Sequence, residues 1–319
     1  MNLHNNQALF SDLIAGAAQE VKLPEVYVEK DYWVTQVLKN LAYSNYVESV
    51  VFKGGTSLSK AYGLIHRFSE DVDLAVLREG LSNNQCRRLI EKVQRTVTKD
   101  LPEIECDPRA SKNSSFRKTV HQYPRCIDGD NFGQASPELI VEVNSFTKPE
   151  PYAKKTIQSF IGIALDKADR QDLIDEFGLE PFDINVLSVE RTLVEKLLGV
   201  VKDSYHEDPV SRLTIRIRHL YDICLILRVG DHDQFLQSVA FQETCTKCIE
   251  DEMTGQYENA VYLREPLIKA PIFMGFPEWK GSLEGTYNGA FSELVYGQLP
   301  TIDEIGQTLD RIRVQVARF

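Results

Sequence analysis

The chain has 319 residues, of which 43% are hydrophobic and 26% are charged, proportions typical of an ordinary globular protein with one large or two modest domains. Its formal net charge of -11 argues against a general nucleic-acid coat protein but permits a local basic face. No apolar run approaches the roughly 20 residues of a membrane span, and no secretory signal is recognised, so we expect a cytoplasmic location. The six scattered cysteines are expected to be reduced thiols.

Residues 7–42 are expected to form two helices separated by Pro24, with structural support as their role. Each has an apolar stripe at helical spacing. The stripe residues are Leu9, Leu13 and Ile14 in the first helix and Val34, Val37, Leu38 and Leu41 in the second. Acidic Asp31 near the start of the second helix suits the helix dipole.

The next segment, residues 52–74 (FKGGTSLSKAYGLIHRFSEDVDL), is predicted to run from a buried strand through a glycine turn and a helix into a second strand. Glycine permits unusual backbone conformations and close approach of a ligand, and unpaired N–H groups in a first helical turn favour an anion. Thr56 or Ser57 is expected to cap the helix. The sequence therefore predicts a phosphate cradle made of Lys53, Gly54, Gly55, Thr56, Ser57 and Lys60.

Asp71 and Asp73 are two residues apart on the second strand, so they project from the same face, with Ser69 in line. Neighbouring carboxylates repel unless a positive charge lies between them, and Mg²⁺ prefers carboxylate and phosphate oxygens. A phosphate cradle beside a metal cradle is the arrangement that phosphoryl or nucleotidyl transfer needs. The alternative is a glycine turn followed by a solvated acidic edge strand. The spacing excludes a P-loop.

KGGTSLSKAY followed by RFSEDVDL resembles the AbiEii/AbiGii-type nucleotidyltransferase toxins of type IV toxin–antitoxin systems, which share the minimal fold of DNA polymerase β. The preceding VEKDYWVTQVLKNLAY resembles the lead-in helix of that family. The resemblance implies an α/β polymerase-β-like domain with a mixed sheet, followed by a C-terminal helical domain.

Two stretches carry positive charge. The helix expected over residues 83–98 has basic residues on its polar side, either as a solvated face or as a contact to an RNA backbone. Residues 107–128 mix basic residues with Phe116 and Tyr123, a composition typical of single-strand RNA surfaces and equally of a plain β-hairpin.

ELIVEVNSF, residues 138–146, is predicted to be a strand with Glu142 at its centre. A carboxylate at mid-strand in a central strand needs a partner, whereas on an edge strand it is merely exposed. Glu142 matches the third acid of the family's sheet, so the resemblance implies that it completes the Mg²⁺ site with Asp71 and Asp73. It would also be placed to deprotonate the attacking hydroxyl.

The catalytic domain is expected to end with a strand over residues 182–187, with Ser188 capping the next helix. RTLVEKL in that helix resembles a family signature in which Lys196 contacts the nucleotide triphosphate. Arg191 and Glu195 are four residues apart and could simply pair.

Residues 211–230 are predicted to be one helix, ending at Gly230, and residues 202–215 before its signature to include a loop. RHLYDI resembles the family signature in which Asp222 is an active-site residue and Arg218 holds a phosphate or the helix pair. A structural ion pair between Arg218 and Asp222 is the alternative. Residues 231–319 are expected to be a helical cap with turns at Pro266, Pro271, 275–277 and Pro300.

We therefore expect a nucleotidyltransferase domain over residues 1–187 and a helical domain over 188–319 that completes the active site. The resemblance implies Mg²⁺-dependent transfer of a nucleoside monophosphate from an NTP to RNA, notably the tRNA 3′ end, which would block translation in phage defence by abortive infection. A separately encoded antitoxin would be the partner. The alternatives are a small-molecule nucleotidyltransferase of the aminoglycoside type and an inert NTP-binding regulator.

Overall fold

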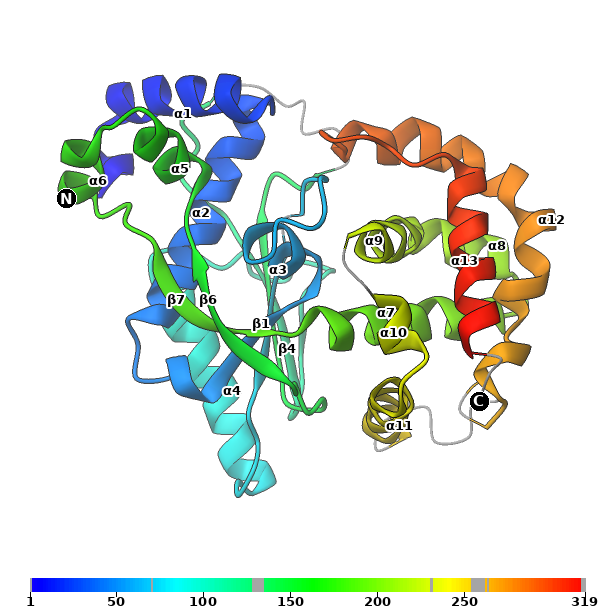
Figure 1. Ribbon diagram of the computed structural model, residues 1–319. Helices are drawn as coiled ribbons and strands as arrows, with labels where there is room; N and C mark the ends of the chain where they lie inside the picture. Colours follow the sequence, from blue (N-terminus) through cyan, green and yellow to red (C-terminus); the bar gives the residue numbers. More distant parts are fainter. Residues whose placement is uncertain are drawn as a thin grey trace. The chain divides into compact units, whose positions relative to one another are not determined.

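The chain folds into two compact units in a computed structural model (Figure 1). The first unit comprises Met1–Gly63, Phe68–Ser145 and Tyr152–Leu187, and the second comprises Leu64–Arg67, Phe146–Pro151 and Ser188–Phe319. None of the described helices is long and apolar enough to cross a membrane. The structure describes residues 2–69, 71–127, 135–229, 232–253, 262 and 264–316.

A seven-stranded mixed sheet forms the centre of the first unit, as expected for the α/β class. Its order is β3-β4-β5-β2-β1-β7-β6, with β2 parallel to β5, β1 parallel to β7, and the other neighbours antiparallel. The strands are β1 (Val50–Lys53), β2 (Val72–Val76), β3 (Ser111–Lys112), β4 (Phe116–His121), β5 (Leu139–Asn144), β6 (Tyr152–Ile157) and β7 (Phe182–Leu187).

Helices surround this sheet, and α2 and α4 pack against its strands. The two N-terminal helices predicted from their apolar stripes are present, and Pro24 is the residue before the second one. The two short helices between β6 and β7 were not anticipated. The helices of this unit are α1 (Gln7–Val21), α2 (Glu25–Ala42), α3 (Gly54–Lys60), α4 (Asn83–Val97), α5 (Phe160–Lys167) and α6 (Gln171–Phe177).

Three charged residues at the start of α2 are buried and paired, which makes this helix an anchor for the unit. Glu29 accepts hydrogen bonds from the backbone of Cys126 and Ile127, and Lys30 donates to the carbonyl of Ser136. Asp31 forms an ion pair with Lys60 and accepts a hydrogen bond of 2.8 Å from the backbone of Phe160. Because buried charges are tolerated only when paired, these contacts explain the polar start of an otherwise apolar helix.

The strand, helix and strand expected around the glycine turn are observed as β1, α3 and β2. The expected cap is wrong, because α3 begins at Gly54 and its preceding residue, Lys53, makes no side-chain capping bond. Ser57 instead donates to the carbonyl of Gly54, at 2.9 Å. The glycines thus form the first turn of the helix itself.

Helices form the second unit, in which α7 packs on α9 and α11, and α12 packs on α13 (Figure 1). Ser188 caps α7 as expected, accepting from the backbone N–H of Arg191 at 3.1 Å. The helices are α7 (Val189–Ser204), α8 (Pro209–Ile215), α9 (Ile217–Arg228), α10 (His232–Leu236), α11 (Val239–Met253), α12 (Pro271–Thr286) and α13 (Ile302–Val316).

Three expectations for this unit are wrong in detail. The single helix expected over residues 211–230 is divided at Arg216 into α8 and α9, and most of the expected loop before it is helical. Pro277, expected in a turn, lies inside α12. Gly230, expected to end α9, lies outside the described residues.

The buried pair of Asp31 and Lys60 predicts a large stability effect. Lys60→Met is expected to lower the free energy of unfolding by about 3 kcal/mol, because it leaves the Asp31 carboxylate buried without its cation. Urea unfolding followed by circular dichroism measures this. Lys92→Met, on the exposed face of α4, is the control and should change stability by less than about 0.5 kcal/mol. Equal effects of the two substitutions would contradict the pairing.

Candidate active site

Charged side chains form a row across four neighbouring strands of the first unit. Lys53 on β1 pairs in register with Asp73 on β2, Asp73 with Glu142 on β5, and Glu142 with Lys118 on β4. Residues directly opposite each other on adjacent strands project from the same face of a sheet. The row therefore places two carboxylates side by side between two lysines. Glu142 lies on a central strand, so the edge-strand alternative is wrong.

Asp73 packs directly on the glycine turn. A Cβ added at Gly54 would lie 2.1 Å from Asp73 Oδ2, and Gly54 has a φ of +82°. A side chain here would meet both a steric and a conformational penalty. The close approach expected at this glycine is thus made by the carboxylate of Asp73. Gly55 belongs to the same first turn of α3.

Lys118 is a site residue that sequence reasoning missed, since it was grouped with the basic stretch. Its Nζ lies 2.7 Å from Glu142 Oε1, with both side chains about a quarter exposed. Burial lowers the pKa of Lys118, but the hydrogen bond and charge of Glu142, with the charges of Asp71 and Asp73, outweigh it and raise that pKa. A single ammonium is therefore stabilised by all the predicted carboxylates. The position of Lys118 opposite Glu142 is evident only from the strand register, not from the sequence.

The expected Mg²⁺ ligands, Asp71, Asp73 and Glu142, stay a prediction. Among the described residues, no group of three or more His, Cys, Asp or Glu side chains is placed to hold a metal ion. Glu142 instead carries the ion pair with Lys118. Asp71 and Asp73 offer the carboxylate oxygens that a hard divalent cation prefers, and both lie within electrostatic reach of Lys118. These two aspartates fit such an ion, with Glu142 as their neighbour.

The other residues of the predicted phosphate cradle make contacts within the protein. Thr56 Oγ1 and Ser69 Oγ are hydrogen-bonded at 3.0 Å, which ties α3 to the segment before β2. Thr56 and Ser57 are buried. Lys60 was expected beside the phosphate, but its ammonium is committed to Asp31 and lies 5.3 Å above the Phe160 ring. Lys60 is therefore a structural residue.

In the second unit, one buried carboxylate links the RTLVEKL segment of α7 to the RHLYDI segment of α9. Asp222 on α9 is completely buried, and its Oδ2 lies 2.7 Å from Lys196 Nζ on α7. Arg67 donates to both oxygens of Asp222, at 2.8 and 2.7 Å. Burial raises the pKa of Asp222, but Arg67 and Lys196 outweigh it and hold that pKa well below its usual range. Asp222 is thus an ionised anchor for two cations.

The alternative interpretation, an ion pair between Arg218 and Asp222, is wrong, because Arg67 and Lys196 bind the carboxylate. Arg218 instead lines a cavity at the junction of α8 and α9. The pair of Arg191 and Glu195 is confirmed at 3.2 Å, and Arg191 also binds Asp251 at 2.7 Å. The roles of Lys196, Arg218 and Asp222 toward a nucleotide stay predictions.

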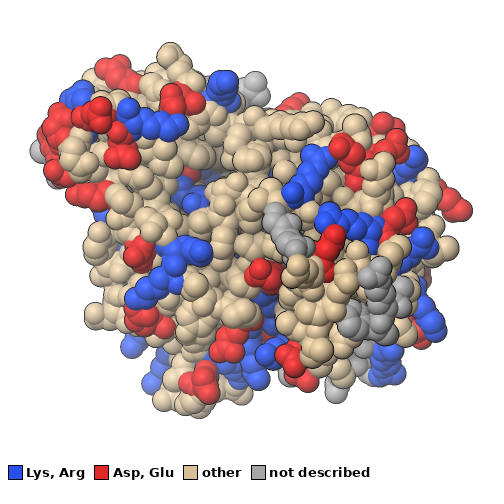
Figure 2. Space-filling model, in the orientation of Figure 1, with Lys and Arg blue, Asp and Glu red and all other residues tan. Residues whose placement is uncertain are grey.

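The basic stretch over residues 107–128 contains the hairpin of β3 and β4, and much of its charge is neutralised locally. Arg109 pairs with Asp107 and Glu138, and Lys112 with Glu103. Tyr123 is buried against Trp33 at a centroid distance of 5.9 Å, so it is not available to stack on a base. On the face shown in Figure 2, acidic and basic side chains are interspersed. The hairpin interpretation is confirmed, and the single-strand RNA surface loses its support here.

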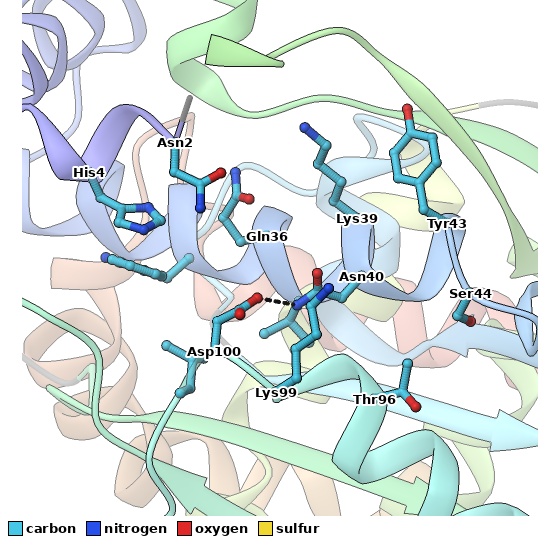
Figure 3. Close-up of a pocket in the computed structure, with 13 residues that line it drawn as sticks. Asn2, His4, Gln36, Lys39, Asn40, Tyr43, Ser44, Thr96, Lys99 and Asp100 are labelled. Carbon is cyan, nitrogen blue, oxygen red and sulfur yellow. Dashed lines mark hydrogen bonds between the residues drawn. The ribbon is translucent and has the colours of Figure 1, made fainter.

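A cavity of about 380 Å³ lies between α2 and the end of α4, away from the charged row (Figure 3). Its polar lining is largely matched within the fold. Asn40 donates to Asp100 at 3.1 Å, Lys39 donates to the carbonyl of Gly178, and His4 is bonded to the Tyr32 hydroxyl at 2.8 Å. Because these polar groups already have hydrogen-bond partners within the fold, the cavity indicates no particular class of ligand.

Comparison with known proteins now identifies the family. The model of the family described as nucleotidyl transferase AbiEii toxin, type IV toxin–antitoxin system, matches residues 36–307. The chain belongs to the AbiEii nucleotidyltransferase toxin family. Its fold is similar to that of MenT4, a nucleotidyltransferase toxin from Mycobacterium tuberculosis H37Rv, with a TM-score of 0.50 and 12% identity over 96% of this chain and 89% of that one. No curated protein sequence matches the chain.

The anchor in the helical unit of this AbiEii protein predicts a pH-dependent stability effect. Asp222→Asn is expected to lower the free energy of unfolding by about 3–5 kcal/mol near neutral pH, because Arg67 and Lys196 lose a buried counter-charge. The folded pKa of Asp222 is depressed, so its stabilisation is present above the unfolded value of 3.8 and is lost as pH falls through the folded pKa. Urea unfolding of both proteins across pH should show the difference shrinking only in acid.

Arginine variants distinguish the observed pair of Arg67 and Asp222 from the alternative pair of Arg218 and Asp222. Arg67→Gln should destabilise the protein by an amount similar to Asp222→Asn, whereas Arg218→Gln should cost less than about 0.5 kcal/mol. A larger loss for Arg218→Gln than for Arg67→Gln would overturn the assignment of partners.

Proposed function

We propose that this AbiEii protein transfers a nucleoside monophosphate from an NTP to an RNA acceptor, notably the tRNA 3′ end, with release of pyrophosphate. The observation that carries the proposal is the register of β1, β2 and β5, which sets Asp73 beside Glu142 and packs Asp73 on the turn at Gly54. Carboxylates beside a glycine turn suit a metal-assisted reaction on a triphosphate. The family supports the class of reaction.

Each residue of the first unit has a proposed task. Asp71 and Asp73 would hold Mg²⁺, which neutralises phosphate charge when bound. The turn over Gly54–Ser57, with Lys53 beside it, would position the triphosphate. Glu142 would accept the proton of the attacking hydroxyl, with Lys118 orienting its carboxylate through their 2.7 Å contact.

For the second unit, we propose that Lys196 neutralises a phosphate charge that develops during transfer. The 2.7 Å contact with Asp222 supports this role, because it fixes the ammonium of an otherwise flexible side chain. Asp222 would then act through Lys196 as a positioning residue.

The biological proposal is a toxin that blocks translation by modifying tRNA, in the manner of abortive infection against phage, and that is controlled by a separately encoded antitoxin. It rests on membership of a type IV toxin–antitoxin family. A small-molecule acceptor of the aminoglycoside type is the second candidate. It is favoured by one observation, the local neutralisation of the basic stretch by Asp107, Glu138 and Glu103.

A single assay distinguishes these functions. The protein is incubated with each labelled NTP, Mg²⁺ and either total tRNA or a panel of aminoglycosides. Label on tRNA supports the toxin, and label on an aminoglycoside supports the second candidate. NTP binding without transfer to any acceptor would contradict both and leave a regulator.

Loss of either aspartate should abolish transfer without unfolding the protein. Asp71→Asn and Asp73→Asn are each expected to reduce the rate by at least about 100-fold, as for removal of a group that stabilises transition-state charge. Gly54→Ala should also impair transfer, because its Cβ would meet Asp73 Oδ2 at 2.1 Å. The exposed Asp172→Asn is the matched control. Initial rates with labelled NTP and circular dichroism provide the measurements, and an active, folded Asp71→Asn protein would refute the proposal.

Direct binding of Mn²⁺, measured by electron paramagnetic resonance, tests the metal assignment independently of turnover. Asp73→Asn should weaken binding by about 10-fold or more, whereas Glu142→Gln should change it by less than about 3-fold. Lys118→Met should tighten binding, since it removes a positive charge near both aspartates. A weakening by Glu142→Gln equal to that by Asp73→Asn would restore Glu142 as a ligand.

A further inference from the structure

Three arginines line a cavity in the helical unit, at the junction where α8 ends and α9 begins. The cavity has a volume of about 280 Å³, near the lower end of the range for ligand sites. It is lined by Asp203, Arg212, Ile215, Arg216, Arg218 and His219. The interruption of the helix at Arg216 brings side chains from both α8 and α9 to this cavity.

The charges around this cavity do not balance. Asp203 is buried and is the only carboxylate among the lining residues, against the guanidinium groups of Arg212, Arg216 and Arg218. It accepts a hydrogen bond from Arg216 and lies 3.8 Å from Arg212 Nε. Within the described part of the chain, Arg218 forms no ion pair. A positive excess is therefore concentrated in a protein whose net charge is -11.

Two residues of α7, Asp203 and Gly199, help to set the geometry of the cavity. Asp203 binds Arg216 through Nε, which orients the rest of that guanidinium. Gly199 on α7 leaves room for the neighbouring groups, because a Cβ there would lie 3.3 Å from His219 Nδ1 and 3.5 Å from an amino group of Arg216. Burial, followed by the charges of Lys196 and Arg216, lowers the pKa of His219 well below its usual value, so this ring adds hydrogen bonding and no charge.

We infer that this cavity is a phosphate-binding site. Arginine presents a planar fork of N–H donors that matches phosphate oxygens, and several such groups around one small cavity favour an anion with more than one negative charge. The phosphate can belong to the backbone of the RNA acceptor or to the triphosphate of the NTP. The assignment of its source rests on the proposed function, whereas the binding of phosphate itself does not.

The test compares two double variants with equal loss of charge. Arg212→Gln/Arg218→Gln removes the cavity arginines but keeps Arg216, on which buried Asp203 depends. The control, Lys167→Gln/Arg170→Gln, removes two exposed cations between α5 and α6 that have no proposed role in binding. Binding of a fluorescein-labelled single-stranded RNA is followed by anisotropy at several salt concentrations, and binding of pyrophosphate and ATP by calorimetry. All proteins also carry Asp71→Asn, so that transfer cannot occur.

The RNA source predicts that the cavity variant binds RNA at least about 10-fold more weakly, with a salt slope reduced by about 1 for each lost phosphate contact. ATP and pyrophosphate binding would then be unchanged. If the phosphate belongs to the NTP, the cavity variant should bind ATP and pyrophosphate more weakly and RNA with unchanged affinity. The inference is overturned if the cavity variant matches the unsubstituted background for all three probes, or if the control with Lys167 and Arg170 replaced loses as much affinity. Because binding is measured without turnover, a failed transfer assay leaves this result intact.

Discussion

The register between β1, β2, β5 and β4 is the constraint on which the candidate site depends. Strand pairing has a side-chain period of two, so a slip by one residue would turn every member of the charged row to the opposite face. Val72 and Leu74 flank Asp73 and are fully buried, and Val141 and Val143 flank Glu142 in the same way. The apolar neighbours thus hold the register, and the register in turn brings the carboxylates together.

Buried ionic contacts stabilise each unit from within. In the first unit the start of α2 binds three separate segments through Glu29, Lys30 and Asp31. In the second unit Asp222 binds Lys196 and Arg67, which are distant in sequence. Removing one partner of a buried pair leaves an uncompensated charge and is strongly destabilising, so each unit depends on both members of these pairs. The buried ion pairs and hydrogen bonds are therefore sufficient to explain why these charged residues lie in apolar helices, without a catalytic role.

The sequence was sufficient where local periodicity decides the outcome. The glycine turn between β1 and β2, the strand around Glu142 and the cap at Ser188 all depend on patterns within a few residues. It was insufficient for the partners of charged side chains. Lys60, Lys118 and Arg218 were grouped by neighbouring residues in the chain, yet their partners, or in the case of Arg218 its cavity, are set by tertiary packing. The break at Arg216 was missed because the apolar pattern continues through it.

Lys118 changes how the carboxylates of the row can be used. Asp73 and Glu142 lie side by side on one face of the sheet, and the Lys118 ammonium, which feels the charges of Asp71, Asp73 and Glu142, relieves their repulsion. A bound divalent ion would supply the same relief more strongly, because it carries twice the charge. In the proposed function, a bound metal and Lys118 would therefore be attracted by the same carboxylates. In the proposed reaction, the 2.7 Å contact with Lys118 would keep the carboxylate of Glu142 oriented toward the attacking hydroxyl while the metal is held by its aspartate neighbours.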